Sequence, residues 1–126
     1  MHVRWGTIKS IETSMAKYGN LILSGKSGEK YCFQSWSFDT RFRSVGAVFF
    51  VSKRLFNDKN FHRASHHAIY IGQTACMSEP MGTVSQIDAF EKHGANCVCV
   101  FPASDEARRM SIVEDLIAGQ QPSLQR

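Results

Sequence analysis

Short apolar runs separated by turn residues dominate the chain up to about residue 74. Runs of this kind, rich in β-branched and aromatic residues and bounded by glycine or polar clusters, are typical of strands. The run 48–51 contains no polar residue, which is the pattern of a strand at a sheet centre covered on both faces. The polar stretch 53–66 behind it is predicted to be a long connection. The predicted strands are 3–12, 21–23, 30–36, 45–52 and 67–74.

Beyond residue 74 the pattern favours helices. Pro80 and Gly82 interrupt any full helix directly behind the last of these strands. A short helix is then expected to close at Gly94, because glycine is the usual residue at a helix C-terminus. The final helix is expected to start at Ser104 as its N-cap and to end at Gly119. The predicted elements are a helix over 87–93, a strand over 96–101 and a helix over 104–118.

This order of elements predicts an α+β fold in which helices pack on a mixed or antiparallel sheet. A chain of 126 residues is large enough for one domain with a real core. Residues 1–36 are interpreted as an N-terminal β-meander that extends a core formed by residues 44–126.

Composition narrows the class of protein only slightly. Hydrophobic residues make up 43% of the chain and charged residues 21%, which are ordinary values for a globular domain. No apolar run approaches the roughly 18 residues that a membrane span requires, and the first residues do not have the pattern of a signal peptide. We therefore expect a cytoplasmic protein without a membrane partner.

The four cysteines do not form a CxxC pair or an evident disulfide framework. Cys97 and Cys99 are two residues apart in a predicted strand, so their side chains share one face. The favoured interpretation is that all four are reduced and that this pair packs as small apolar groups. Metal binding or redox chemistry is the alternative. The cysteines are Cys32, Cys76, Cys97 and Cys99.

Charge is distributed unevenly between the two halves of the chain. Residues 1–63 contain eleven Lys/Arg and four Asp/Glu, a net +7, whereas residues 64–126 contain four and seven, a net −3. A basic half favours contact with phosphates or with an acidic protein, although solvated basic loops are the common alternative. The candidate nucleic-acid-binding residues are Arg41, Arg43, Lys53, Arg54, Lys59 and Arg63.

One motif resembles the end of a phosphate-binding loop without completing it. Gly25, Lys26 and Ser27 have the right order, but the glycine required five positions earlier is Asn20. A strand and a hairpin are predicted around this segment in place of the flexible loop and helix of that motif. We therefore expect a plain β-turn.

Glu114 is the most unusual charged residue of the predicted C-terminal helix. On a helical wheel it falls within the apolar arc, whereas Asp115 points away. A carboxylate on a buried helix face is costly unless it is paired, hydrogen-bonded or bound to a cation. The alternative is a glutamate at the edge of the stripe. The apolar arc consists of Met110, Val113 and Ile117, with Ala107 and Ala118 beside it.

Residues from about 21 to 125 resemble small stand-alone proteins of the GIY-YIG nuclease superfamily. The matching segments are 25–33, 45–49, 69–74, 93–96 and 114–117, with Pro122 behind them. The resemblance implies a DNA-cutting fold in which Tyr70 is a catalytic residue and Glu114 binds Mg²⁺ or Mn²⁺. It further implies that these two lie on one side of the sheet, with the strand through Val48 and Phe49 next to that of Tyr70.

The catalytic pattern of that family is only half present. Its first tyrosine is replaced by Val48, or by Phe49 if the strand is aligned one residue later, and its arginine by Pro80. Neither apolar side chain has a hydroxyl to activate water, and loss of a cation at the phosphate commonly costs about 10²–10³-fold in rate. Lys53, Arg54, His66 and His67 are the conceivable substitutes. The family's later polar positions fall on Gly82, Thr83, Val84, Ser85 and Gln125.

The leading hypothesis is accordingly a catalytically degenerate GIY-YIG protein that binds nucleic acid, or a protein that handles nucleic acid, as an inhibitor or regulator. It requires no cofactor, and its small basic character fits a phage or mobile-element setting. An active metal-dependent endonuclease with a rebuilt site, holding Mg²⁺ or Mn²⁺ at Glu114, is the alternative. A protein-interaction domain without a nucleic-acid role is the third hypothesis.

Overall fold

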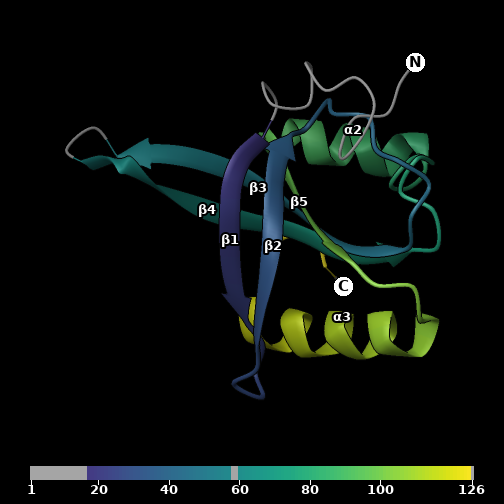
Figure 1. The fold of residues 1–126 in the computed structure, drawn as a ribbon. Helices are drawn as coiled ribbons and strands as arrows, with labels where there is room; N and C mark the ends of the chain where they lie inside the picture. Colours follow the sequence, from purple (N-terminus) through teal and green to yellow (C-terminus); the bar gives the residue numbers. More distant parts are fainter. Residues whose placement is uncertain (1–16, 58–59, 126) are drawn as a thin grey trace.

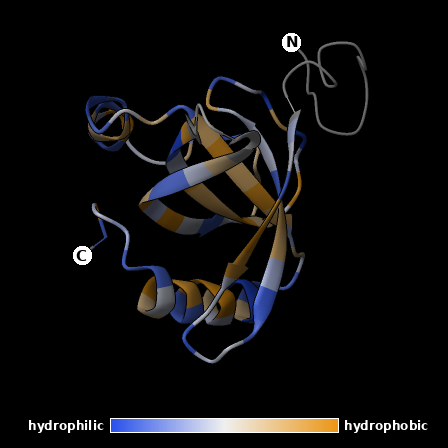
Figure 2. Cartoon of the chain, turned by 90° about the vertical axis from the view of Figure 1, so that its left-hand side faces the viewer, coloured by the Kyte–Doolittle hydropathy of each residue, from blue (hydrophilic) through white to orange (hydrophobic). Residues whose placement is uncertain are grey.

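A computed structural model describes residues 17–57 and 60–125 and shows one curled five-stranded sheet between two helices (Figures 1 and 2). The strand order is β1-β2-β5-β3-β4, and every described pairing is antiparallel. The α+β prediction is thereby confirmed, while the predicted strand 3–12 lies outside the described residues. The elements are β1 (Lys17–Ser24), β2 (Lys30–Ser37), β3 (Ala47–Asn57), β4 (Asn60–Thr74), α2 (Val84–Lys92), β5 (Cys97–Pro102) and α3 (Glu106–Gln120).

The centre of the sheet is covered on both faces, as the unbroken apolar run predicts. Phe49 and Val51 point into a core that includes Phe90 of α2, and we call this side the α2 face. Val48 and Phe50 point into a second core on the side of α3, the α3 face. Alternate residues of one strand thus fill two separate cores, and the hydrophobic central strands lie between the helices (Figure 2).

The prediction of a long connection over residues 53–66 is wrong. β3 continues to Asn57 and β4 begins at Asn60, so that these residues pair with one another in a long hairpin. The hairpin projects beyond the rest of the sheet (Figure 1). Water reaches the side chains of a two-stranded ribbon that extends past the neighbouring strands. Polar residues can therefore occupy its strand positions, while the two strands keep the backbone hydrogen bonds between them. The polar composition therefore marks exposure and not a loop.

A bulge in β4 determines which side chains reach each core. Val51 pairs with Tyr70 and Ser52 with Ala68, which leaves Ile69 as the extra residue. Ile69 and Tyr70 consequently both pack on the α2 face, whereas Ile71 returns to the α3 face. Without the bulge, the alternation of side chains would direct Tyr70 toward α3.

α2 starts three residues before the predicted helix because Thr83 caps it. The Thr83 hydroxyl accepts a hydrogen bond from the Gln86 backbone N–H, and the Gln86 side chain accepts one from the Thr83 N–H, which completes a capping box. The helix ends at the predicted place, with Gly94 at φ +84° behind the last turn. Phe90 is its one fully buried residue and packs edge-on against Phe38.

α3 differs from its prediction in its cap and in its buried face. Asp105, not Ser104, is the N-cap, because its carboxylate accepts a 2.9 Å hydrogen bond from the Arg108 N–H. The helix runs through Gly119 to Gln120. Its buried residues are Arg109, Ile112 and Leu116, whereas Met110, Ala107, Ala118 and Glu114 of the predicted apolar arc are exposed.

Arg109 is the physical reason why the buried face of α3 differs from the prediction. Its guanidinium lies under the helix at 4% exposure and donates to the Gln73 side chain and to the carbonyls of Ala103 and Ser104. These bonds rotate the stripe of Arg109, Ile112 and Leu116 onto the sheet, and Met110 turns toward solvent. Val113 and Ile117 of the predicted arc are partly buried against the same core, so a hydropathy wheel, which places every arginine on the outside, selects a face that is rotated from the one packed on the sheet.

Candidate functional site

Tyr70 and Glu114 reach a common cavity from opposite faces of the sheet. The Tyr70 ring packs on the α2 face, with its centroid 5.2 Å from that of Phe90 and 6.1 Å from that of Phe49. Glu114 extends from α3 and is exposed. The expectation that the two lie on one side of the sheet is therefore wrong, and this counts against the GIY-YIG resemblance. The predicted pairing of the strand through Val48 and Phe49, β3, with the Tyr70 strand, β4, is confirmed. The cavity measures about 290 Å³ and is lined by Tyr70, Ile71, Gly72, Gln73, Met110, Val113, Glu114 and Gln125.

Gln125, which the resemblance aligns with the family's asparagine, has a structural role in this cavity. Its amide nitrogen donates to the Ile71 carbonyl at 2.9 Å, and its amide oxygen accepts from the Ile71 N–H at 2.8 Å. The side chain therefore continues the hydrogen bonding of β4 at the edge of the sheet. Both polar ends of the amide are occupied by the backbone of the protein.

The replaced family positions offer no substitute chemistry at this cavity. Val48 is fully buried on the α3 face and Phe49 is buried on the α2 face. Neither side chain has a hydroxyl, so the family's first tyrosine is not replaced in either alignment. Pro80 lies in the bend before α2, where it lines a different cavity of about 580 Å³ together with Arg41.

The carboxylate next to Glu114 is fully engaged in holding a turn. Asp115 accepts hydrogen bonds from the Ser27 N–H at 2.8 Å, the Ser27 hydroxyl at 2.6 Å and the Tyr31 hydroxyl at 2.8 Å. The bonds from Ser27, followed by that from Tyr31, hold the pKa of Asp115 below its ordinary value. Burial and the bond to Asp115 raise the pKa of Tyr31 to about 12.

This contact explains the segment that resembles a phosphate-binding loop. Gly28 N–H bonds to the Gly25 carbonyl at 3.0 Å, which confirms the predicted β-turn. A side chain at Gly25 would overlap the Asp115 carboxylate. The turn is thus shaped to dock on α3.

The predicted basic residues do not line a single groove. Arg41 lies beside Pro80 and Ile87 at the start of α2, whereas the Lys53 side chain covers Gly94 behind the end of α2. Arg43 is exposed in the bend before β3. Arg63 belongs to β4, and Lys59 lies outside the described residues.

Lys53 and Arg54 occupy opposite faces of the hairpin. Lys53 pairs with His67, whereas Arg54 pairs with His66 and stacks over the Tyr18 ring at 4.3 Å from its centroid. The backbone of Arg54 is bound by the Asn96 side chain, whose amide oxygen accepts at 2.6 Å and whose amide nitrogen donates at 3.1 Å. The backbone of Arg54 is therefore anchored to the segment that leads into β5.

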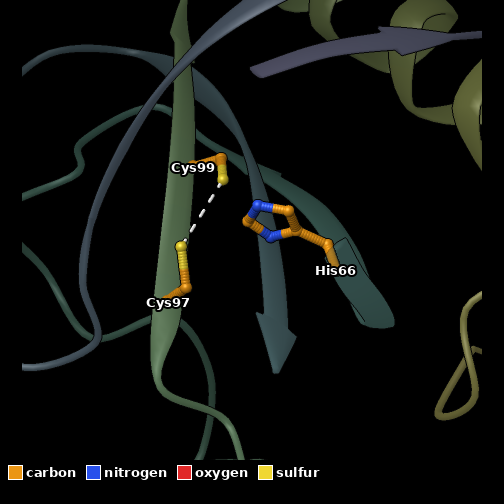
Figure 3. A group of neighbouring side chains, drawn as sticks. All are labelled: His66, Cys97 and Cys99. Carbon is orange, nitrogen blue, oxygen red and sulfur yellow. Dashed lines mark hydrogen bonds between the residues drawn. The ribbon is translucent and has the colours of Figure 1, made fainter. Parts of the chain in front are cut away.

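A group of potential metal ligands lies on the α3 face and was missed by sequence reasoning. His66 of β4 and the thiols of Cys97 and Cys99 of β5 present ligand atoms that all lie within 4.8 Å of one another (Figure 3). The signal in the sequence was incomplete, because the two cysteines were placed on one face but His66 was assigned to a connection. Once residues 53–66 form strands, His66 faces the same core.

The hydrogen bonds within this group involve two buried serines. Cys97 Sγ is 3.8 Å from Cys99 Sγ, Ser35 Oγ is 3.2 Å from Cys99 Sγ, and Ser52 Oγ is 2.9 Å from His66 Nδ1. The bond between the two thiols lowers the pKa of Cys97, with a smaller effect from His66, and raises that of Cys99. All four cysteines are free thiols, as predicted.

Comparison of the chain with protein-family models, with curated proteins and with solved structures finds no match. The GIY-YIG resemblance therefore rests on the residues named above. Within the described part of the chain, neither helix has the length and apolar character needed to cross a membrane.

Proposed function

We propose that this protein is a nucleic-acid-binding module and that it binds through its β3–β4 hairpin. The observation that carries the proposal is the charge of this element. β3 and β4 contain Lys53, Arg54 and Arg63 and no aspartate or glutamate, and the charges of the two residues between them, Asp58 and Lys59, cancel. An element with net positive charge attracts a polyanion and is screened by salt.

The shape of the hairpin supports the same proposal. A two-stranded antiparallel ribbon fits the major groove of a duplex, and basic residues on both of its faces can reach the phosphates on both sides. Lys53 and Arg54 lie on opposite faces of the ribbon at its base, where Lys53 covers Gly94 and Arg54 stacks on Tyr18.

The stack of Arg54 on Tyr18 adds a surface for unpaired bases. Tyr18 is 41% exposed, so an aromatic ring and a guanidinium plane are both presented at the base of the hairpin. Bases stack on such groups with little sequence preference, typically for about 1–3 kcal/mol each. Duplex and single-stranded ligands are therefore compared in the test below.

The geometry of the cavity at β4 supports binding without cleavage. A hydrolytic site needs an activated water, a metal and a cation at the phosphate. Tyr70 and Glu114 approach from different faces, and the Gln125 amide is committed to the backbone of Ile71. Apolar side chains at positions 48 and 49 and the proline at position 80 support the same conclusion.

The double variant Lys53→Ala/Arg54→Ala tests the binding surface. Affinity for DNA and RNA oligonucleotides, single- and double-stranded, should fall with little dependence on sequence. Each lost phosphate contact should lower the log–log salt slope by roughly 0.7–0.9. Lys26→Ala/Lys30→Ala is the matched control, because it removes the same charge from two exposed positions beyond the far end of β1, one in the turn and one at the start of β2. Unchanged affinity in the first variant, or no binding to any oligonucleotide at low salt, contradicts the proposal and favours an acidic protein partner.

A plasmid-nicking assay with Mg²⁺ or Mn²⁺ tests the absence of cleavage. Wild-type protein should nick no faster than the Glu114→Ala variant. Robust nicking that disappears in this variant would instead establish the active metal-dependent endonuclease.

A further inference from the structure

Three adjacent strands contribute polar side chains to one buried point on the α3 face. β5 supplies Cys97 and Cys99, β3 supplies Ser52, and β4 supplies His66. Both thiols and the serine are fully buried, whereas His66 is half-buried. The curl of the sheet lets His66 reach across β3 to the thiols of β5, toward which its imidazole ring is directed (Figure 3).

The distances match the coordination of zinc. Two Zn–S bonds of about 2.3 Å at the tetrahedral angle hold their sulfur atoms roughly 3.8 Å apart. Cys97 Sγ and Cys99 Sγ are separated by 3.8 Å, and all three ligand atoms lie within 4.8 Å of one another. We propose that His66, Cys97 and Cys99 bind one Zn²⁺ ion.

Ser52 supplies the outer contact that a ligating histidine normally has. Such a histidine uses one ring nitrogen for the metal and hydrogen-bonds through the other, which fixes the tautomer and the orientation of the ring. Ser52 Oγ lies 2.9 Å from His66 Nδ1, so Nε2 is the ligand in this arrangement. Ser52 is a positioning residue and does not itself coordinate the ion.

The chemistry of the donors selects zinc over the hard cations. Two thiolates and an imidazole are ligands for Zn²⁺, whereas Mg²⁺ and Ca²⁺ prefer oxygen. Two thiolates also neutralise the charge of the ion, which avoids leaving a net charge in the core. The exposed part of His66 provides a path for the ion.

Among the described residues the site has three protein ligands, which leaves the fourth tetrahedral position to water. The ion links β4 to β5 across β3 and so fastens the base of the hairpin to the sheet centre. This inference does not depend on the proposed function, because metal binding is measured without nucleic acid.

Zinc retention tests the inference directly. Reduced protein is loaded with Zn²⁺ alone, desalted and assayed for metal; we expect one Zn²⁺ per chain. Loss of a ligand in His66→Gln or Cys97→Ala should weaken binding by more than the roughly 10–100-fold that changes of outer-shell partners cost. His67→Gln and Cys32→Ala are matched controls at exposed positions and should retain the ion. Retention in His66→Gln, or no retention in the wild type, overturns the proposal.

Cobalt provides a second readout that does not depend on the stability of the cysteine variants. Co²⁺ added to the wild type should give the thiolate-to-cobalt charge-transfer band and the strong visible bands of a tetrahedral site. Ser52→Ala should keep the bands and weaken affinity by about 10–100-fold. His66→Gln alters a half-buried position, so a well-folded variant is expected, and its spectrum should lose tetrahedral intensity. A wild-type spectrum without charge transfer would show that the thiols do not coordinate.

Discussion

The two faces of the central sheet are built from different chemistry. The core on the α2 face is formed by aromatic and aliphatic side chains, with Trp36, Phe49 and Phe90 at its centre. The core on the α3 face contains two thiols and is bordered by every buried polar or charged residue of the described part of the chain, namely Ser35, Ser52 and Arg109. Buried polar groups are costly unless they are paired. The α2 face is therefore a source of stability, and the α3 face carries the chemistry.

The largest effect on the free energy of unfolding is expected on the α2 face, where a single buried residue joins α2 to the apolar core. Phe90 is the only fully buried side chain of α2 and contacts the rings of Phe38 and Tyr70. Phe90→Ala should lower the free energy of unfolding by about 3–5 kcal/mol in chemical denaturation. The control Val84→Ala, at an exposed position of the same helix, should change it by less than about 0.5 kcal/mol. A loss below about 1 kcal/mol for Phe90→Ala would show that α2 contributes little to the core.

A smaller effect is expected when the polar face loses its buried cation. Arg109→Met keeps much of the side-chain volume but leaves the Gln73 side chain and the carbonyls of Ala103 and Ser104 without their donor. Hydrogen bonds to charged groups contribute roughly 1.5–3 kcal/mol, so we expect a loss of about 2 kcal/mol in the same denaturation experiment. Arg108→Met, at the neighbouring exposed position, is the matched control. A stabilised Arg109→Met variant would show that the α3 face tolerates hydrocarbon as well as the α2 face does.

The sequence is informative about the α2 face because hydropathy alone determines it. The apolar run of β3 and the glycine behind α2 predict a buried central strand and a helix end, and the structure has both. These features depend on local preferences that are visible within a few residues. The length of the β3–β4 hairpin cannot be predicted in this way, because the outer parts of its two strands pair with each other through backbone hydrogen bonds and do not pack against an apolar core.

The α3 face is less predictable because its features come from pairing. The bulge at Ile69 is what returns Ile71 to this face, and the orientation of α3 depends on a hydrogen bond from Arg109 to Gln73, which is distant in sequence. His66 joins the two cysteines only after the register of the hairpin is known. One extra residue in a strand reverses every side chain behind it, so a site that spans three strands cannot be located from spacing.

The smallest and most specific effect concerns the docking of the β1–β2 turn on α3 through Asp115. The pKa of Asp115 is lower in the folded protein than the roughly 3.9 of an unfolded chain. Its contribution to stability is therefore present above about pH 4 and is lost as the pH falls through the folded pKa. Asp115→Asn cannot titrate and should be less stable than the wild type at neutral pH.

The difference in unfolding free energy between the wild type and Asp115→Asn should accordingly be constant from neutral pH to about pH 5 and should shrink below it. Denaturation series at several pH values measure this difference. Asp88→Asn, on the exposed surface of α2, removes the same charge and is the matched control for net charge. A difference that grows toward acid pH would contradict the hydrogen bonds of Ser27 and Tyr31 as the source of the stabilisation, and would remove from the α3 face one of the polar contacts that distinguish it from the α2 face.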